Sequence, residues 1–146
     1  MTGHGDIHHL REELEQLFDD LWRGPRFARS QVGFRPHIDV YRTESPAELV
    51  IIVDLAGVDP DDVTIVLHDY TLILAGERPR PRPDRQASYH HIEIDYGPFE
   101  RRLALPEAVD ADAAHASYER GMLRIVLPIA EERRTAKVSI AVKTVR

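Results

Sequence analysis

Apolar and polar residues alternate through most of residues 37–128, which is the pattern of half-buried β-strands. In the clearest run, Val63, Ile65 and Leu67 fall on one face of an extended chain. Six other short runs share this character and are bounded by turn residues: 37–41, 48–55, 72–75, 99–105, 114–118 and 122–127. Many short strands at this spacing predict an all-β sandwich.

The first part of the chain has a helical period instead. Its apolar residues recur mainly at steps of three and four and form one stripe on a helix: Ile7, Leu10, Leu14, Leu17, Phe18, Leu21 and Trp22. Asp6 is a suitable N-cap, and Gly24-Pro25 ends the predicted helix. A single helix of this length is marginal in isolation, so the stripe should need a partner. That partner is either its own domain or the apolar surface of another subunit or protein.

Residues 77–98 interrupt the strand pattern. Three prolines between Arg78 and Arg85 cannot donate to a ladder, so an extended, solvated arm is predicted there. Beyond them, residues 88–94 alternate enough to form a strand. A connection of this length is unusual in a compact domain and is often functional. The arm is either a spacer that lets 88–94 reach a neighbour or a ligand for a proline-recognising or acidic partner.

The last segment, 129–146, is a β-branched peptide of period two. Val138, Ile140 and Val142 alternate there with small or polar residues. Such a peptide can form a last strand of its own sheet, or it can add to an edge or groove of a neighbour.

Composition and charge narrow the function. The chain has 146 residues, no cysteine and a net charge of −6, so we expect one domain without disulfides or cysteine–zinc sites. The N-terminal arm 1–36 has a net charge of −1, the predicted sandwich 37–128 has −8, and the tail 129–146 has +3. An acidic chain is a poor general binder of nucleic acid or anionic membrane, and no apolar run approaches the ~20 residues of a membrane span. With no secretory signal at the N-terminus, we predict a cytoplasmic protein.

Patterns for catalysis and metal binding are weak. The five serines include no G-x-S-x-G elbow, there is no Gly-rich phosphate loop, and paired acidic residues fall in turns. His4 and His8 are spaced for a metal on a helix, but no carboxylate spacing completes the site. We therefore predict no enzyme, no metal and no cofactor. His90 and His91 would make a subunit contact pH-sensitive if their segment forms one.

Four motifs follow one another across 37–128. They are Asp54-Leu55-Ala56-Gly57-Val58; Leu72-x-Leu74-x-Gly76-Glu77-Arg78; Tyr96-Gly97-Pro98-Phe99-Glu100-Arg101 followed by Leu105-Pro106; and Ala116-x-x-x-Arg120-Gly121-Met122-Leu123-x-Ile125-x-Leu127-Pro128. In this order they resemble the small heat-shock protein (α-crystallin domain) family, although Ala56 stands where the family has Pro. Residues 14–22 are similar to the amphipathic start of bacterial members.

The resemblance implies an immunoglobulin-like β-sandwich and an ATP-independent chaperone that holds unfolding client proteins. It also implies a homo-oligomer built from dimers in which a strand of the long loop adds to the partner's sheet. The exchanged strand would be 88–94 and its acceptor 37–41, and the residues implied in the exchange are Tyr89, His90, His91 and Ile92 on the loop, Ile38 and Val40 on the acceptor, and Arg101. Arg101 matches an arginine that supports the dimer in animal members; the alternative is a pair with a nearby carboxylate.

The resemblance also implies an anchor in the tail and a groove to receive it. The anchor matches either Val138-Ser139-Ile140 or Ile140-Ala141-Val142, and the groove maps to two strands: Val63, Ile65 and Leu67, with Ala114, Ala116 and Tyr118. The client-binding surface would be the apolar stripe in residues 1–36, a segment that we call the leader. Its residues are Leu10, Leu14, Leu17, Phe18, Leu21 and Trp22. A related sandwich, the co-chaperone CS domain, is the alternative reading, but it usually lacks the long loop and the 116–128 signature.

Overall fold

In a computed structural model, the structure describes residues 33–131 and 138–145. The strands are β1 (Ile38–Thr43), β2 (Glu48–Asp54), β3 (Thr64–His68), β4 (Thr71–Arg78), β5 (Gly97–Ala104), β6 (His115–Glu119), β7 (Met122–Pro128), β8 (Val138–Ser139) and β9 (Val142–Thr144). Two single turns of 3₁₀ helix, η2 (Pro60–Asp62) and η3 (Ala111–Ala113), are the helical elements of this described part. No helix in these ranges is long and apolar enough to cross a membrane.

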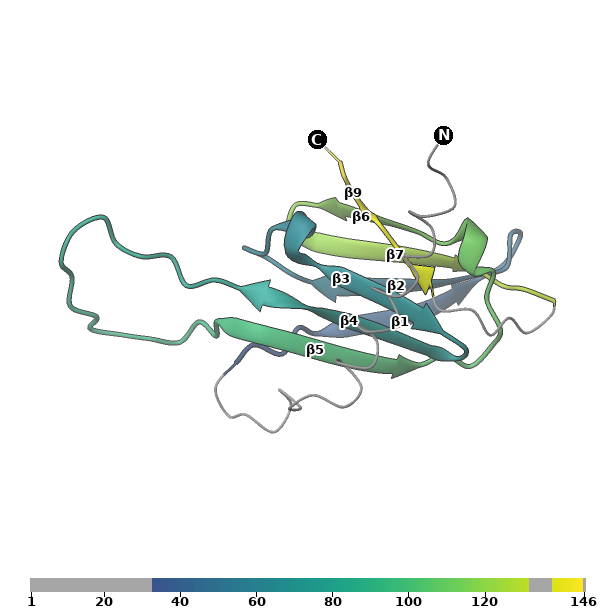
Figure 1. Ribbon diagram of the computed structural model, residues 1–146, viewed down its shortest axis with the longest axis horizontal. Coiled ribbons are helices and arrows are strands. Elements are labelled where there is room, and N and C mark those ends of the chain that lie inside the picture. The colour runs from purple at the N-terminus through teal and green to yellow at the C-terminus, as the bar shows by residue number, and fades with distance from the viewer. Residues whose placement is uncertain (1–32, 132–137, 146) are drawn as a thin grey trace, which may run out of the picture.

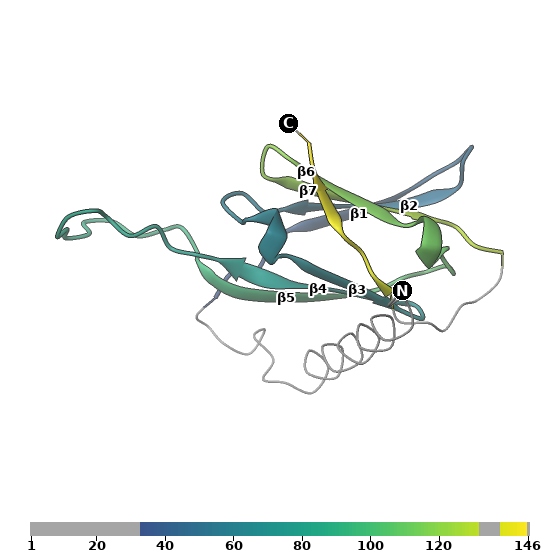
Figure 2. The same cartoon turned by 45° about the horizontal axis from the view of Figure 1, so that its top comes forward.

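The strands form two stacked sheets, which confirms the predicted all-β sandwich. One sheet has the order β1-β2-β7-β6-β9, and the other has the order β5-β4-β3-β8. Figure 2 shows the two layers, with the C-terminal strands crossing from one to the other. Pairing is antiparallel throughout the described sheets except between β6 and β9, which run parallel.

The core lies between the sheets and follows the alternation seen in the sequence. Every second residue of β3 and β4 points inward, including Ile65, Leu67, Leu72 and Leu74. Similar residues of the other strands and turns complete one buried cluster: Leu49, Ile51, Val53, Leu55, Val58, Phe99, Leu105, Val109, Ala116, Leu123, Ile125, Leu127 and Ile140. Because each such side chain contributes roughly 1.5–3 kcal/mol when buried, this cluster is the main source of stability.

Two glycines of the sequence motifs allow close approaches. Gly121 has φ +81° in the β6–β7 turn, and a Cβ there would lie 3.1 Å from the Cα of Ala56. Gly76 lies against the ring of Phe99, where a Cβ would meet Cζ at 2.7 Å. A larger residue at position 76 would therefore push β4 away from its neighbour β5, and one at position 121 would push the β6–β7 turn away from the end of β2.

Three expectations differ from the structure or fall outside it. Residues 88–94 form no strand in this single chain, because no neighbouring edge lies beside them. β4 continues to Arg78 and β5 begins at Gly97, so the connection is 79–96 and is two residues shorter at each end than the predicted 77–98. The predicted helix and client-binding stripe, which span residues 6–24, lie outside the described residues.

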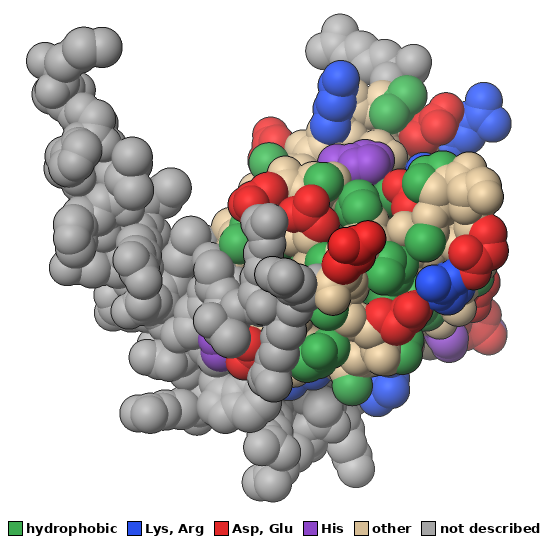
Figure 3. Space-filling view, turned by 90° about the vertical axis from the view of Figure 1, so that its right-hand side faces the viewer, with side chains coloured by type: hydrophobic (Ala, Val, Ile, Leu, Met, Phe, Trp, Pro, Cys, Tyr) green, Lys and Arg blue, Asp and Glu red, His purple; other side chains and the backbone are tan. Residues whose placement is uncertain are grey.

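Charge on the sandwich follows the excess of acidic residues in 37–128. Figure 3 shows the end of the sandwich opposite the long loop, where acidic side chains are scattered among hydrophobic ones. Among the described residues, no group of three or more metal-ligating side chains is close enough to hold an ion.

Candidate functional site

The C-terminal tail lies in a groove between β3 and β6, which we call the tail groove. β8 pairs antiparallel with β3, and β9 pairs in parallel with β6, so the tail joins the two sheets along one side (Figure 2). Between these strands, the Ile140 amide donates to the Ile65 carbonyl at 3.0 Å. The Ile140 side chain is only 5% exposed and closes this side of the core.

Of the six residues expected to line the groove, Leu67, Ala116 and Tyr118 pair with tail residues, and the Ile65 carbonyl accepts from the Ile140 amide. The six expected residues all lie at the core. They belong to the core cluster or pack against it: Val63, Ile65, Leu67, Ala114, Ala116 and Tyr118. Of the three anchor candidates, Ile140 is the most deeply buried and is common to both registers. Val142 packs against the same cluster, while Val138 is half-buried and pairs with Leu67.

Tyr118 links the groove to the turn that follows β2. Its hydroxyl donates to the Leu55 carbonyl at 3.0 Å, and its own carbonyl accepts from the Val145 amide at 2.9 Å. Burial, and then the nearby Asp59 and Asp54 carboxylates, raise the pKa of Tyr118. The phenol therefore stays protonated and keeps this hydrogen bond at neutral pH.

The opposite side of the sandwich lies between the edge strands β1 and β5, and we call it the open seam. Val40 pairs with the core residue Ile51, yet it is 47% exposed there, and Tyr41 beside it is 45% exposed. Near one end, Arg42 donates from Nε to a carboxylate oxygen of Glu107 at 2.7 Å. Among the described residues, the outer edge of β1 has no strand partner, with Val40 exposed toward the seam and Tyr41 exposed on the opposite face of β1.

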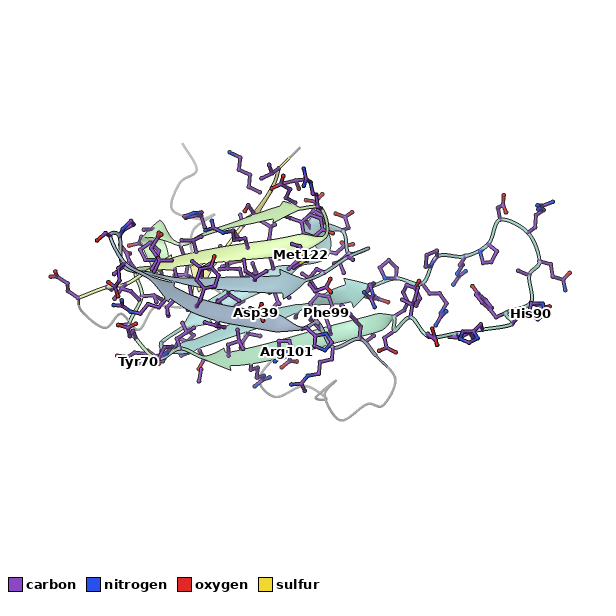
Figure 4. All side chains as sticks on the ribbon, turned by 180° about the vertical axis from the view of Figure 1, so that it is seen from behind. Asp39, Tyr70, His90, Phe99, Arg101 and Met122 are labelled. Carbon is purple, nitrogen blue, oxygen red and sulfur yellow. The ribbon has the colours of Figure 1, made fainter. Side chains whose placement is uncertain are left out.

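At the other end of the open seam, Arg101 joins β5 to the segment before β1. Its Nη1 donates to the Pro36 carbonyl at 2.6 Å (Figure 4). Burial, and then the nearby charge of Arg35, lower the pKa of Arg101, which nonetheless stays protonated. Among the described residues, the hydrogen bond of Arg101 is to this backbone carbonyl, and both its role in a dimer and the alternative of a carboxylate partner stay predictions.

The long loop between β4 and β5 forms an arm that extends away from both sheets (Figure 1). Three apolar side chains on it are more than half exposed, namely Tyr89 at 54%, Ile92 at 61% and Ile94 at 59%. His90 lies at the far end of the arm, well away from Asp39, the second residue of β1 (Figure 4). Within residues 33–131 and 138–145, no segment pairs with either the arm or the outer edge of β1.

Comparison with known families identifies this architecture. The profile of the Hsp20/alpha crystallin family matches residues 41–143, which include the second half of β1, the rest of the sandwich, the long loop and most of the tail. The chain belongs to this family.

Its relatives include bacterial and plant members. Small heat shock protein C2 of Rickettsia felis is 27% identical over 132 residues, which cover 90% of this chain and 84% of that protein. The 16.9 kDa class I heat shock protein 1 of Triticum aestivum is 33% identical and is covered over 88% of its length, with 83% of this chain matched. The solved structure of heat shock protein 16.0 from Schizosaccharomyces pombe has a TM-score of 0.62 at 28% identity, over 70% of this chain and 94% of that one.

Sequence reasoning missed a stack of arginines and aromatic rings at the base of the arm of this Hsp20-family chain. The Arg78 guanidinium lies 3.6 Å from the ring centroid of Phe34 and 5.5 Å from that of Tyr96. The Arg80 guanidinium lies 4.6 Å from the Tyr96 centroid and 5.8 Å from that of Tyr89. These contacts join the outgoing and returning halves of the arm, and we call them the arginine stack.

A signal for the arginine stack was present in the sequence. Arg78 and Arg80 are two residues apart, so they share one side of an extended, proline-stiffened chain. Arg78 also donates from Nε to the Asp95 carbonyl at 2.8 Å, which brings the returning half of the arm alongside. The base of the arm is thus held by side chains, although no backbone ladder spans it.

Proposed function

We propose that this Hsp20-family chain is an ATP-independent chaperone that holds unfolding proteins in the cytoplasm, as a dissociable homo-oligomer of strand-swapped dimers. The observation that carries the proposal is the combination of an exposed apolar arm with an exposed strand edge. Neither finds a partner within the described part of its own chain. An edge of this kind is a template for pairing with another chain.

The arm and the open seam have complementary chemistry. Ile92 and Ile94 project from one side of an extended segment, and Val40 is exposed on β1. Adding residues 88–94 of one subunit to β1 of the other would pair the free backbone groups and bury these side chains. A two-fold dimer would form this contact twice, because each subunit offers one arm and one edge.

The tail groove provides a second, weaker contact. Two anchor side chains contribute roughly 3–6 kcal/mol of gross apolar burial, before the cost of ordering the tail. The paired strands are short, with two residues in β8 and three in β9. We propose that the tail exchanges between its own groove and that of a neighbouring subunit, which lets dimers assemble and separate.

Clients would bind the apolar stripe of the leader, exposed when the assembly separates. The chain would thus divide into an N-terminal leader (1–36), a sandwich that carries the long loop (37–128) and a docking tail (129–146). The charge of −8 on 37–128 would keep a client-loaded complex hydrated and soluble.

The test is aggregation of a thermolabile client protein, followed by light scattering without ATP, together with native mass before and after heating. The full chain should suppress scattering and have a mass above that of a dimer. Deleting residues 1–36 should leave a folded dimer with weaker protection. Absence of suppression would contradict the holdase role, and a monomeric native mass would favour a CS-like interaction module instead.

A further inference from the structure

The two edge strands of the open seam, β1 and β5, run in the same direction. Their starts lie together, where the Phe34 amide before β1 donates to the Pro98 carbonyl of β5 at 3.3 Å. Their far ends also lie together, where Arg42 of β1 binds Glu107 just beyond β5. Because the returning half of the arm leads directly into β5, it runs in this direction too (Figure 1).

This direction decides how an arm would meet the open seam of a second copy. The arm points away from its own sandwich, so two copies reach each other's seams only if their arms point in opposite directions (Figure 1). A two-fold axis between the copies meets this condition. Residues 88–94 of one copy would then run antiparallel to β1 of the other, since each arm returns in the direction of its own β1.

The face on which each side chain lies narrows the allowed registers. Ile38 and Val40 lie on the core-facing side of β1, and Asp39 lies on its solvent-facing side. On the arm, Ile92 and Ile94 share one side of an extended chain, and the residues between and beside them share the other. A slip of one residue would turn both isoleucines toward water, so the registers that remain differ by steps of two residues.

Charge separates these remaining registers. In one of them Ile92 lies opposite Val40. Glu93 then lies directly opposite Asp39, and a further shift in the same direction brings an aspartate of the arm to that place. When the arm is shifted by two residues the other way, His91 lies opposite Asp39 instead. Like charges directly opposite each other destabilise a sheet and opposite charges stabilise it, so the register with His91 is favoured.

The register with His91 also suits the positions on either side. Glu93 falls opposite His37, which again sets a carboxylate against an imidazole. Tyr89 falls opposite Tyr41, where two aromatic rings can pack across the strands. Ile92 still faces an isoleucine of β1 on the core-facing side. One shift therefore improves several cross-strand pairs at once.

The backbone of β1 would bring His91 and Asp39 close together. The Asp54 amide donates to the His37 carbonyl at 3.1 Å, so the odd-numbered residues of β1 turn their backbone groups toward β2. Asp39 would therefore sit opposite His91 with no hydrogen bond between the two backbones. The Cα atoms of such pairs are about 4.5 Å apart, closer than those of hydrogen-bonded pairs. The imidazole and the carboxylate would then be within ion-pair reach.

We propose that His91 of one subunit lies opposite Asp39 of the other, and that this pair fixes the strand register and strengthens the dimer when His91 is protonated. The proposal rests on the strand-swapped dimer proposed above and adds the two residues that align it. His91 already pairs with a carboxylate in the single chain, where its Nε2 lies 3.0 Å from an oxygen of Glu93. A second carboxylate would hold the proton of His91 more firmly in the dimer, so this contact gains as the pH falls from about 8 to about 5.5.

Other titratable or charged side chains face the proposed pair. On the same side of β1, β2 and β7, with the residue before β1, they are His37, Tyr41, Glu48, Asp54 and Arg124, and on the arm they are Tyr89 and Glu93. Of these residue types only histidine titrates near neutral pH, and protonated His37 opposite Glu93 would also favour association. His90 lies on the core-facing side of the arm, where protonation would oppose association. The contribution of His91 must therefore be isolated from those of the other histidines.

A double-mutant cycle isolates the pair in the full-length chain. His91→Gln, Asp39→Asn and their combination are compared with the unchanged chain by the dimer dissociation constant, measured by analytical ultracentrifugation. At about pH 5.5 the two changes should be coupled by about fivefold, because a two-fold dimer contains the pair twice, and at about pH 8 the coupling should nearly vanish. His90→Gln with Asp39→Asn is the matched control and should show no coupling at either pH. Absence of coupling in acid, in a chain that still dimerises, would overturn the pair.

The absence of cysteine from the chain allows the register to be trapped directly. Tyr89→Cys with Tyr41→Cys places two thiols at opposite, closely spaced positions of the proposed register, within the range of a disulfide. Tyr89→Cys with Thr43→Cys is the control, since the register that sets Glu93 against Asp39 would join these two positions instead. Under mild oxidation the first pair should link the subunits at least about tenfold faster, because the second pair is diagonal in the proposed register, about 7–8 Å apart.

The outcomes of the trapping experiment separate the register from the dimer itself. A faster disulfide from the variant with Thr43→Cys, or equal rates for the two variants, would overturn the proposed register. A chain that forms neither disulfide, although its native mass is that of a dimer or larger, would overturn it as well. A monomeric native mass would instead contradict the strand-swapped dimer, and the register with it.

Discussion

The two long sides of the sandwich, the tail groove and the open seam, differ in how far the gap between the sheets is filled. At each side, an edge strand of one sheet faces an edge strand of the other. In the tail groove, the chain's own tail fills the gap and buries Ile140 to 5% exposure. At the open seam, two arginines connect the sheets at the ends, while Val40 between them stays 47% exposed.

In the described residues, the tail groove is therefore filled by the chain's own tail, whereas the edge of β1 at the open seam has no strand beside it. A tail can leave its groove and return, so the groove suits a reversible contact. The exposed β1 edge has nothing within the described residues to cover it, and its complement is an arm directed away from the molecule. We therefore expect the open seam to support the stable dimer and the tail groove to support the labile higher assembly.

The largest effect is expected from a charge placed in the open seam. Val40→Asp puts a carboxylate where the proposed dimer buries an apolar side chain, at a position that the single chain leaves half exposed. Each buried, unpaired polar group costs about 2 kcal/mol, and a two-fold dimer contains the change twice, for a loss of about 4 kcal/mol. The dimer dissociation constant should rise about 1,000-fold, measured by analytical ultracentrifugation.

The matched control for this prediction is Met122→Asp, because Met122 is 42% exposed on β7, outside the seam. It should leave the native mass unchanged. Ile92→Asp on the arm should weaken the dimer as Val40→Asp does. If Val40→Asp leaves the dimer constant unaltered, strand exchange at this seam is wrong.

A smaller loss is expected from truncating the tail anchor. Ile140→Ala removes a buried side chain and should cost about 3 kcal/mol of docking free energy. Hydrogen exchange at the Ile140 and Val145 amides, which donate to Ile65 and Tyr118, should accelerate by about 100-fold. Native mass should fall toward the dimer, most strongly when Val138→Ala is added.

Ser139→Ala is the control for the anchor, since Ser139 is exposed beside it. It should leave both the exchange rates and the native mass as they are. Retention of the large assembly after the double alanine substitution would show that the tail does not join subunits.

Sequence pattern predicted much of the sandwich because local alternation has a direct structural meaning. Val63, Ile65 and Leu67 can share a face only on an extended chain, and prolines mark where a ladder must stop. The pattern of Val138, Ile140 and Val142 could not say which edge the tail would join, since period two is the same for any edge. The contact between Arg101 and Pro36 was equally hidden, because a backbone carbonyl leaves no trace in residue identity.

The two arginines of the open seam should differ in their contribution to stability. Arg101→Met removes a charged donor from a partly buried carbonyl contact and should cost about 1.5 kcal/mol of unfolding free energy, measured by urea denaturation. Arg42→Met breaks a pair with Glu107 that is open to solvent, where ion pairs contribute little. Equal losses from both changes would mean that burial does not distinguish the two ends of the seam.

The smallest effect is expected on the rate of dimer association, through contacts that order the arm before it reaches the open seam. Tyr96 lies between Arg78 and Arg80, so Tyr96→Leu removes two contacts of the arginine stack while keeping an apolar side chain. Each exposed cation–π contact is worth about 0.5 kcal/mol, and a looser arm must be ordered again on association. The association rate of the dimer should therefore fall about threefold with little change in the stability of the sandwich, as measured by subunit exchange and thermal unfolding. Tyr89→Leu, which removes only the longer contact to Arg80, should slow association less, and an equal or greater effect would show that the stack does not preorganise the arm.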